Sequence, residues 1–244
     1  MTLFSGQVYG GVGQLGAHNK VAAAAGVAAW LYGDYGGSGG ARIDSANCIA
    51  AYCPIGAADL SASYGNLANP GTYDAAPGVA PTWSASTGWI FNGSSQYLKT
   101  GVVPTLNYSA ICRFSAVTNS AFLFGVVTTA SDFAIVPNGT DIGNVVRYRR
   151  GGSEVNKGPV MTAGVVALAA VSAYRNGAID GTFTDNGENP STDIWIATYS
   201  GPAGGKMAGK IQALWIYNSV LTAQQIAGLT GAINALTSAG NYYL

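Results

Sequence analysis

Charged side chains are scarce in this chain, which has 244 residues and only 9% Asp, Glu, Lys and Arg. A typical soluble protein holds about 25%. The 11 basic and 11 acidic residues balance. The chain therefore lacks the excess of positive charge that nucleic acids and anionic membrane surfaces attract, and we expect neither as a partner. A protein of low net charge associates readily, so we expect a homo-oligomer within a larger assembly.

Long hydrophobic runs are also missing. The best candidate, Val21–Leu31, is well short of the about 18 apolar residues that a membrane helix needs, so we interpret it as a buried strand or a short helix. The chain is not deficient in core-forming residues, because 48% are hydrophobic and 11% are aromatic. This composition excludes intrinsic disorder of the whole chain.

Residues that commonly perform catalysis are rare. His18 is the only histidine, and Glu154 and Glu188 are the only glutamates. A glycosidase needs two carboxylates on either side of the scissile bond, and neither glutamate lies in a motif that would supply such a pair. No nucleophile elbow or phosphate-binding loop is present either. We expect a protein that is not an enzyme.

Cysteine is limited to Cys48, Cys53 and Cys112. The odd number leaves at least one thiol unpaired, and the spacing does not match that of a metal site. We expect buried free thiols, which fits folding in a reducing compartment.

Glycine, by contrast, is abundant, with 35 residues. It is concentrated in residues 1–40, which end in the run Gly36–Gly40 and contain few charges. We predict an apolar Gly-rich arm and hinge over 1–40, followed by one domain over 41–244.

The pattern changes after residue 40 to short β-type segments separated by turn residues. Asn-Gly pairs, the strongest short signal for a hairpin, occur at 92–93, 138–139, 176–177 and 186–187. This pattern predicts an all-β antiparallel sandwich. The predicted strands are Cys48–Tyr52, Trp89–Asn92, Tyr97–Thr100, Tyr108–Ala116, Ala121–Val127, Asp132–Val136, Val145–Arg150, Val165–Arg175, Ile194–Tyr199 and Ala208–Tyr217.

One helix is expected, over about 222–236. Thr222 and Gln225 have the spacing of a capping box. Ile226, Leu229, Ile233 and Leu236 then form one apolar stripe. We expect this helix to cover an edge or one end of the sandwich.

Four segments together resemble a laminin G-like, concanavalin A-like domain. They are residues 88–101 (GWIFNGSSQYLKTG), 108–117 (YSAICRFSAV), 173–181 (AYRNGAIDG) and 208–229 (AGKIQALWIYNSVLTAQQIAGL). The last is the most specific, because a strand, a capping box and a helix follow in the family's order. The resemblance covers about residues 41–236 and implies an antiparallel jelly-roll sandwich.

The resemblance implies less about function, because one fold hosts many functions. Free-standing domains of this composition resemble virion proteins of tailed phages. We expect a non-enzymatic virion structural protein, either a capsid decoration or head-fibre protein or part of a tail fibre, that binds neighbouring virion subunits. The alternative is a lectin-like module on a phage or cell surface that binds a surface glycan. The expected location is the virion, or the extracellular space for the alternative.

Two groups of candidate binding residues stand out. Aromatic residues before the hinge and in the long loop before residue 84 could contact a glycan or a neighbouring subunit, or could pin the loop to the domain. They are Trp30, Tyr32, Tyr35, Tyr64, Tyr73 and Trp83. No cofactor is expected, although calcium is possible, because several acidic and amide side chains lie close together in the sequence. They are Asp180, Asp185, Asn186, Glu188 and Asp193.

Arg147, Arg149 and Arg150, followed by Lys157, form one basic cluster. Alternation along a strand places Arg147 and Arg149 on one face. They could meet an acidic neighbour in an assembly or simply face solvent.

Overall fold

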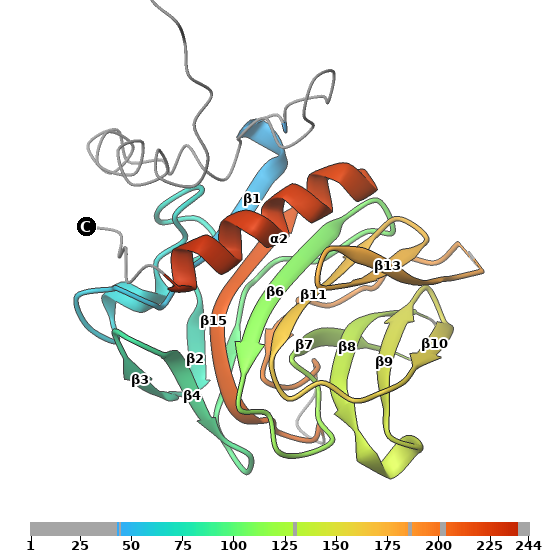
Figure 1. The fold of residues 1–244 in the computed structure, drawn as a ribbon. Coiled ribbons are helices and arrows are strands. Elements are labelled where there is room, and N and C mark those ends of the chain that lie inside the picture. Colours follow the sequence, from blue (N-terminus) through green and yellow to red (C-terminus); the bar gives the residue numbers. More distant parts are fainter. Residues whose placement is uncertain (1–42, 44, 129–130, 185–186, 201–203, 239–244) are drawn as a thin grey trace, which may run out of the picture.

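The structure is a computed structural model that describes residues 43, 45–128, 131–184, 187–200 and 204–238. Two antiparallel β-sheets pack face to face, and a single long helix near the C-terminus lies against one of them (Figure 1). The architecture confirms the predicted all-β sandwich with a C-terminal helix. The arm predicted over 1–40, with His18, Trp30, Tyr32 and Tyr35, lies outside the described residues.

Sheet A has the strand order β13-β12-β11-β6-β15-β4-β3, and β1 also pairs with β15. The long strand β15 is central, because it pairs with β6 along its length and with β4 and β1 on its other side. The strands are β1 Cys48–Tyr52, β3 Thr82–Ser84, β4 Gly88–Asn92, β6 Ser109–Ser115, β11 Gly164–Ala169, β12 Ser172–Arg175, β13 Ala178–Thr182 and β15 Ala208–Tyr217.

Sheet B has the order β10-β9-β8-β7-β14-β5-β2. Its strands are β2 Ala76–Val79, β5 Tyr97–Lys99, β7 Phe124–Val127, β8 Asp132–Gly139, β9 Val145–Arg150, β10 Ser153–Lys157 and β14 Trp195–Ile196. Three short 3₁₀ turns complete the described elements: η3 Ser45–Asn47, η4 Ala62–Tyr64 and η5 Thr140–Ile142.

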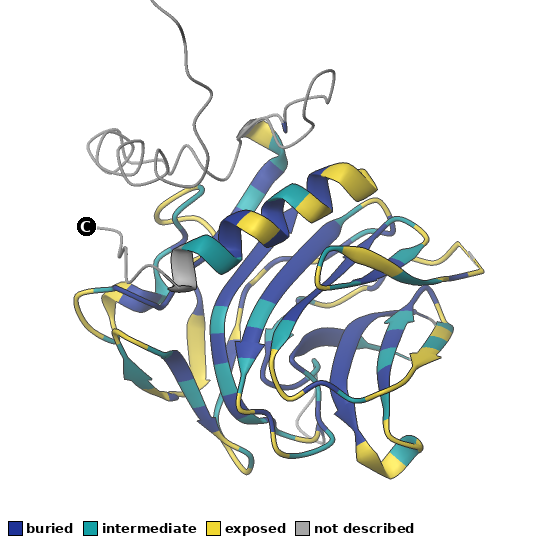
Figure 2. Cartoon of the chain, viewed as in Figure 1, coloured by how far each residue is buried: buried dark blue, intermediate teal, exposed yellow. Residues whose placement is uncertain are grey.

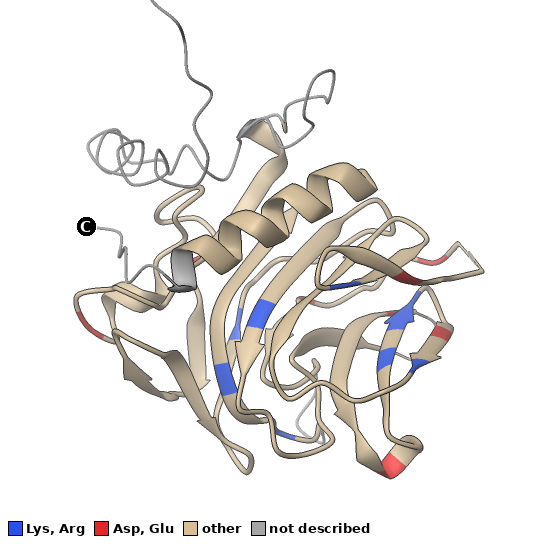
Figure 3. Cartoon of the chain, viewed as in Figure 1, with Lys and Arg blue, Asp and Glu red and all other residues tan. Residues whose placement is uncertain are grey.

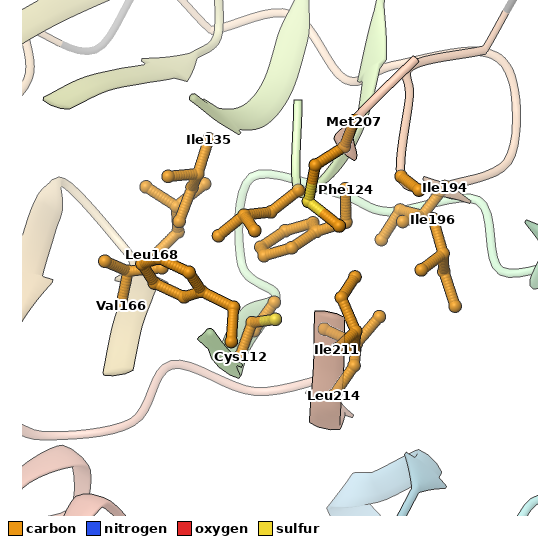
Figure 4. Close-up of a cluster of buried hydrophobic side chains, with 14 of the residues drawn as sticks. Cys112, Phe124, Ile135, Val166, Leu168, Ile194, Ile196, Met207, Ile211 and Leu214 are labelled. Carbon is orange, nitrogen blue, oxygen red and sulfur yellow. The ribbon is translucent and has the colours of Figure 1, made fainter. Parts of the chain in front are cut away.

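The main core lies between the two sheets. Strand alternation directs one set of side chains inward, where Cys112, Phe124, Ile135, Ile196 and Leu214 meet with no solvent exposure (Figure 4). Burying a large apolar side chain contributes about 1.5–3 kcal/mol, so this layer supplies most of the driving force for folding.

Helix α2, Ala223–Ser238, covers the outer face of sheet A. The fully buried side chains of Ile226, Leu229 and Ile233 pack against a second apolar cluster on β6, β11 and β15, while other α2 residues are exposed (Figure 2). The expectation that the helix covers an edge or end is therefore wrong. The outer face of sheet A carries apolar residues such as Val165 and Trp215, and α2 removes them from water. In the described chain, no helix is both long and apolar enough to span a membrane.

The Asn-Gly signals have mixed outcomes. Asn176-Gly177 forms the predicted hairpin between β12 and β13, with φ angles of 49° and 86°. The pair at 92–93 instead joins β4 of sheet A to β5 of sheet B, and the Asn92 carboxamide oxygen accepts backbone N–H groups of 94 and 95. The pair at 138–139 lies within β8, and the turn follows at Gly143 and Asn144. Asn186 lies outside the described residues.

The segment 165–175, predicted as a single strand, is a hairpin of β11 and β12. Its turn contains Ala170 with φ of 46° and the exposed Val171. Neither residue type signals a turn, which explains the error.

Other strand boundaries also differ from expectation. Strands β2, β3 and β10 were not predicted, and all three are edge strands with few buried residues. The predicted strand 121–127 shortens to β7. The predicted strand 194–199 shortens to β14, because Ala197 has a positive φ of 64° that interrupts pairing.

The basic cluster is paired within the chain. Arg147 lies 3.3 Å from Glu154, and Arg149 lies 3.1 Å from Asp132 and 3.6 Å from Glu154. Strands β8 and β10, which flank β9, supply these carboxylates (Figure 3). Arg150 points to the opposite side of β9 and is buried. Arg147 and Arg149 therefore form ion pairs within sheet B.

The three cysteines are buried free thiols, as expected. Burial raises the pKa of Cys48 and of Cys53 to about 12, and it also raises the pKa of Cys112. At neutral pH these groups are protonated side chains of the core.

Candidate functional site

The long loop between β1 and β2 is held to the sandwich by Asn66, which is 1% exposed. Its carboxamide accepts the backbone N–H of Ala51 at 2.8 Å and donates to the carbonyl groups of Ile49 and Thr72, each at 2.8 Å. A buried amide with these partners ties both ends of the loop to β1. No sequence motif singles out Asn66.

The three described aromatic candidates from this region separate into two kinds. Trp83 donates from Nε1 to the Pro54 carbonyl at 2.7 Å, and Tyr64 lies beside the buried Trp89 with ring centroids 6.2 Å apart. Both side chains pack against the main core, so they pin the loop. Tyr73 differs, because 43% of it is exposed.

Tyr73 sits on strained backbone. Its φ is 59°, in the left-handed region that costs a residue with a side chain about 1–2 kcal/mol. The buried hydroxyl of Tyr52 donates a hydrogen bond to the Tyr73 carbonyl and holds this conformation. Strain of this kind persists only where the surrounding structure imposes it, and it is common at binding sites.

The pKa of Tyr52 indicates which charged groups lie near Tyr73. Burial, and then the negative charges of Asp74 and Asp193, raise the pKa of Tyr52. Asp193 comes from a segment far along the chain, so the loop carrying Tyr73 and the segment before β14 meet at one end of the sandwich.

Gly101 and Tyr108 complete the surroundings of Tyr73. A Cβ placed on Gly101, whose φ is +71°, would lie 3.6 Å from Cδ1 of the Tyr73 ring. Burial raises the pKa of Tyr108, and the neighbouring Tyr73 raises it further. Tyr108 is half-buried, with its apolar part against the main core.

Asp193 links this group to sheet B. Its Oδ2 accepts the backbone N–H of Gly101 at 3.2 Å, and its Oδ1 accepts Nε1–H of Trp195 at 3.0 Å. One carboxylate therefore positions an indole ring relative to a backbone segment that is 92 residues away in the sequence.

Trp195 and Tyr97 lie on the outer face of sheet B. Their neighbours Ile196 and Leu98 point inward and are fully buried, so strand alternation turns Trp195, Tyr97 and Lys99 outward. The two rings stack with centroids 4.9 Å apart and an interplanar angle of 17°. Both are half-buried.

Two ammonium groups lie over these rings. Nζ of Lys99 is 4.8 Å from the centroid of Trp195, and Nζ of Lys206 is 5.0 Å from the centroid of Tyr97. Lys206 also donates to the Gly204 carbonyl at 2.9 Å, and burial lowers its pKa. We call the connected group Tyr73, Gly101, Asp193, Trp195 and Tyr97 the aromatic strip, which the two lysines flank.

The calcium candidates have other partners. Oδ2 of Asp180 accepts hydrogen bonds from the Tyr148 hydroxyl and from Nε of Arg175, each at 2.9 Å. Asp193 belongs to the aromatic strip, and Asp185 lies outside the described residues. Among the described residues, no three His, Cys, Asp or Glu side chains are grouped in a way that could hold a metal ion. The calcium loop stays a prediction.

Tyr73 and Asp193 are both candidates from the sequence, but in different groups, one aromatic and one acidic. The sequence does not single out Tyr97, Gly101 or Trp195. Tyr97 and Lys99 flank the buried Leu98 on β5, and this alternation is the one signal that could have placed both on a solvent face. No local signal indicates that Trp195 lies beside them.

The chain matches no protein family model, and no curated protein matches its sequence. Solved structures share its fold. Domain 4 of AbnA, an extracellular GH43 arabinanase from Geobacillus stearothermophilus solved with arabinotriose, has a TM-score of 0.51 and 17% identity. That match covers 75% of this chain and 98% of the other chain.

Two larger proteins contain a similar sandwich. A mutant Trypanosoma rangeli sialidase with trans-sialidase activity has a TM-score of 0.58 and 12% identity over 89% of this chain and 38% of its own. A botulinum neurotoxin type C structure, described in terms of cell entry that depends on two ganglioside molecules, has a TM-score of 0.52 and 12% identity. That match covers 78% of this chain and 52% of the toxin chain. At these identities, the likeness establishes a shared β-sandwich fold.

Proposed function

We propose that this chain is a glycan-binding module that contacts sugars through the aromatic strip. The observation that carries the proposal is the row of partly exposed rings of Tyr73, Trp195 and Tyr97, in which Asp193 holds Trp195. Sugar rings present both C–H faces and hydroxyl groups. Aromatic rings beside a few fixed polar groups complement both, and this is the usual composition of a ligand site.

Two features support the strip as a prepared surface. The carboxylate of Asp193 and the backbone of Gly101 fix Trp195 before any ligand arrives, so little side-chain freedom is lost on binding. The strained backbone of Tyr73 keeps a large ring exposed that would otherwise favour burial. The sandwich neighbours also include proteins whose structures are described with arabinotriose or with gangliosides.

The proposed module is not an enzyme. Glu154 lies near Arg147 and Arg149, and both oxygens of Asp193 accept hydrogen bonds, so these carboxylates have structural partners. A role in a virion, as a decoration or fibre protein, stays a prediction compatible with glycan binding. The expected contacts with neighbouring subunits involve residues 1–40, and light scattering of the full chain tests the predicted homo-oligomer.

The test is a glycan array with the full chain, followed by calorimetric titration of the sugars that bind. Tyr73→Ala and Trp195→Ala should each weaken binding by about tenfold or more, because each removes a ring that a bound sugar would cover. Ile179→Ala is the control, since Ile179 is 58% exposed on β13, an edge strand of the other sheet. Equal binding by all three variants, or an array without a bound sugar, would refute the proposal.

A further inference from the structure

The two lysines beside the aromatic strip differ from three arginines of the described chain. Arg147, Arg149 and Arg175 are ion-paired with Glu154, Asp132 or Asp180. Neither Lys99 nor Lys206 is ion-paired within the described part of the chain. Two ammonium groups with no ion pair among the described residues therefore lie beside the stacked rings.

Both ammonium groups are held in place. Lys99 lies over the indole of Trp195, and Lys206 lies over the Tyr97 ring while it donates to the carbonyl of Gly204. Cation–π contacts of this kind limit the freedom of a long side chain. An ammonium group has three N–H donors. Lys206 also donates to the Thr198 hydroxyl at 3.4 Å, so it keeps one donor for a ligand. Lys99 has no hydrogen-bond acceptor among the described residues and keeps all three.

Asp193 places one negative charge in the strip, against the positive charges of the two lysines. Asp193 accepts one N–H from Gly101 and one from Trp195, so its carboxylate is engaged in positioning the indole. A ligand lying on the strip would therefore meet apolar ring surface together with two pre-positioned positive charges.

We infer that the aromatic strip selects glycans with a negatively charged group, a carboxylate or a sulfate, which Lys99 and Lys206 contact. This inference rests on the proposed glycan-binding function and specifies the class of ligand. Charge-assisted hydrogen bonds are about twice as strong as neutral ones, so two of them provide discrimination between charged and neutral sugars.

The experiment compares matched sugars. The full chain is titrated with a neutral oligosaccharide, with the same backbone carrying a uronic or sialic acid, and with its sulfated form, each at 50 and 300 mM salt. The charged sugars should bind about tenfold more tightly than the neutral one, and the preference should shrink at high salt. The carboxylated and sulfated arms show which anion the lysines accept.

The double variant Lys99→Gln/Lys206→Gln should lose this preference and retain the affinity for the neutral sugar. Lys157→Gln, an exposed lysine on β10 at the far edge of sheet B, serves as the matched control and should behave as wild type. Thermal unfolding confirms that each variant folds. An unchanged preference in the double variant, or a wild type that binds neutral and charged sugars equally, would overturn the inference but leave the proposed function intact. Absence of any sugar binding overturns both.

Discussion

Trp195 donates a hydrogen bond from Nε1 to the carboxylate of Asp193 at 3.0 Å, and the same carboxylate accepts the backbone N–H of Gly101. The contact joins β14 to the chain just after β5, and Gly101 there lies beside the Tyr73 ring. Asp193 thus acts as a positioning residue for the aromatic strip, and several properties of the protein depend on this region.

Asp193→Asn should weaken binding of the neutral sugar by about five- to tenfold with little change in stability. The amide retains one acceptor but presents an N–H group to a neighbouring donor, so Trp195 or Gly101 loses its partner. Titration calorimetry measures the affinity, and Glu188→Gln in the same exposed segment is the control. Combining Asp193→Asn with Trp195→Ala should add little further loss, because the carboxylate acts through the indole. Fully additive losses would argue against that role.

Tyr73→Gly should be more stable than Tyr73→Ala by about 1 kcal/mol, although both lose the ring. Glycine adopts a φ of 59° without the steric cost that any Cβ brings. Urea unfolding of the two variants measures the difference, and both should bind sugar weakly. A more stable Ala variant would show that the backbone at residue 73 is not strained.

Removing the helix N-cap should destabilise the fold moderately. Thr222 donates its N–H to Oε1 of Gln225 at 2.9 Å and accepts the N–H of Gln225 at 3.2 Å. Thr222→Ala removes the acceptor and should cost about 1 kcal/mol in the free energy of unfolding. Thr222→Ser keeps the hydroxyl and should cost much less. If both substitutions have the same effect in urea unfolding, the capping box is not responsible.

Stability should fall at alkaline pH because the core thiols resist ionisation. An unfolded thiol loses its proton near pH 9, whereas Cys48 and Cys53 keep theirs to about pH 12 in the fold. Their contribution is therefore complete below pH 9 and is lost as the pH rises from 9 to 12, by at most about 1.4 kcal/mol per thiol and pH unit.

Urea unfolding between pH 7.5 and 11, with a reducing agent present, measures this slope. Cys53→Ala should make the pH dependence shallower by one thiol, and the remaining slope comes from Cys48, Cys112 and buried tyrosines such as Tyr148, whose pKa burial also raises. A variant with the wild-type slope would contradict the assignment.

Local interactions account for the features that could be predicted from the sequence. The capping box of Thr222 and Gln225 and the hairpin at Asn176-Gly177 each depend on residues within a few positions of one another, and both form as expected. The sequence does not predict the hairpin at Ala170, because alanine is not a residue type that favours turns. The hairpin predicted at Asn92-Gly93 was wrong, because an Asn-Gly turn can also join two sheets.

The sequence by itself therefore determined the fold class, the C-terminal helix and its cap, because strand alternation and capping are properties of short segments. Only the tertiary structure decided the aromatic strip. Its members come from the loop before β2, from β5 and the residues after it, and from β14 and the segment before it. They meet because Leu98 and Ile196 pack in the same core layer and pair across adjacent strands. The register of this pairing is set by contacts between segments far apart in the sequence. Tyr97, Trp195 and Asp193 therefore come together although no local sequence pattern indicates it.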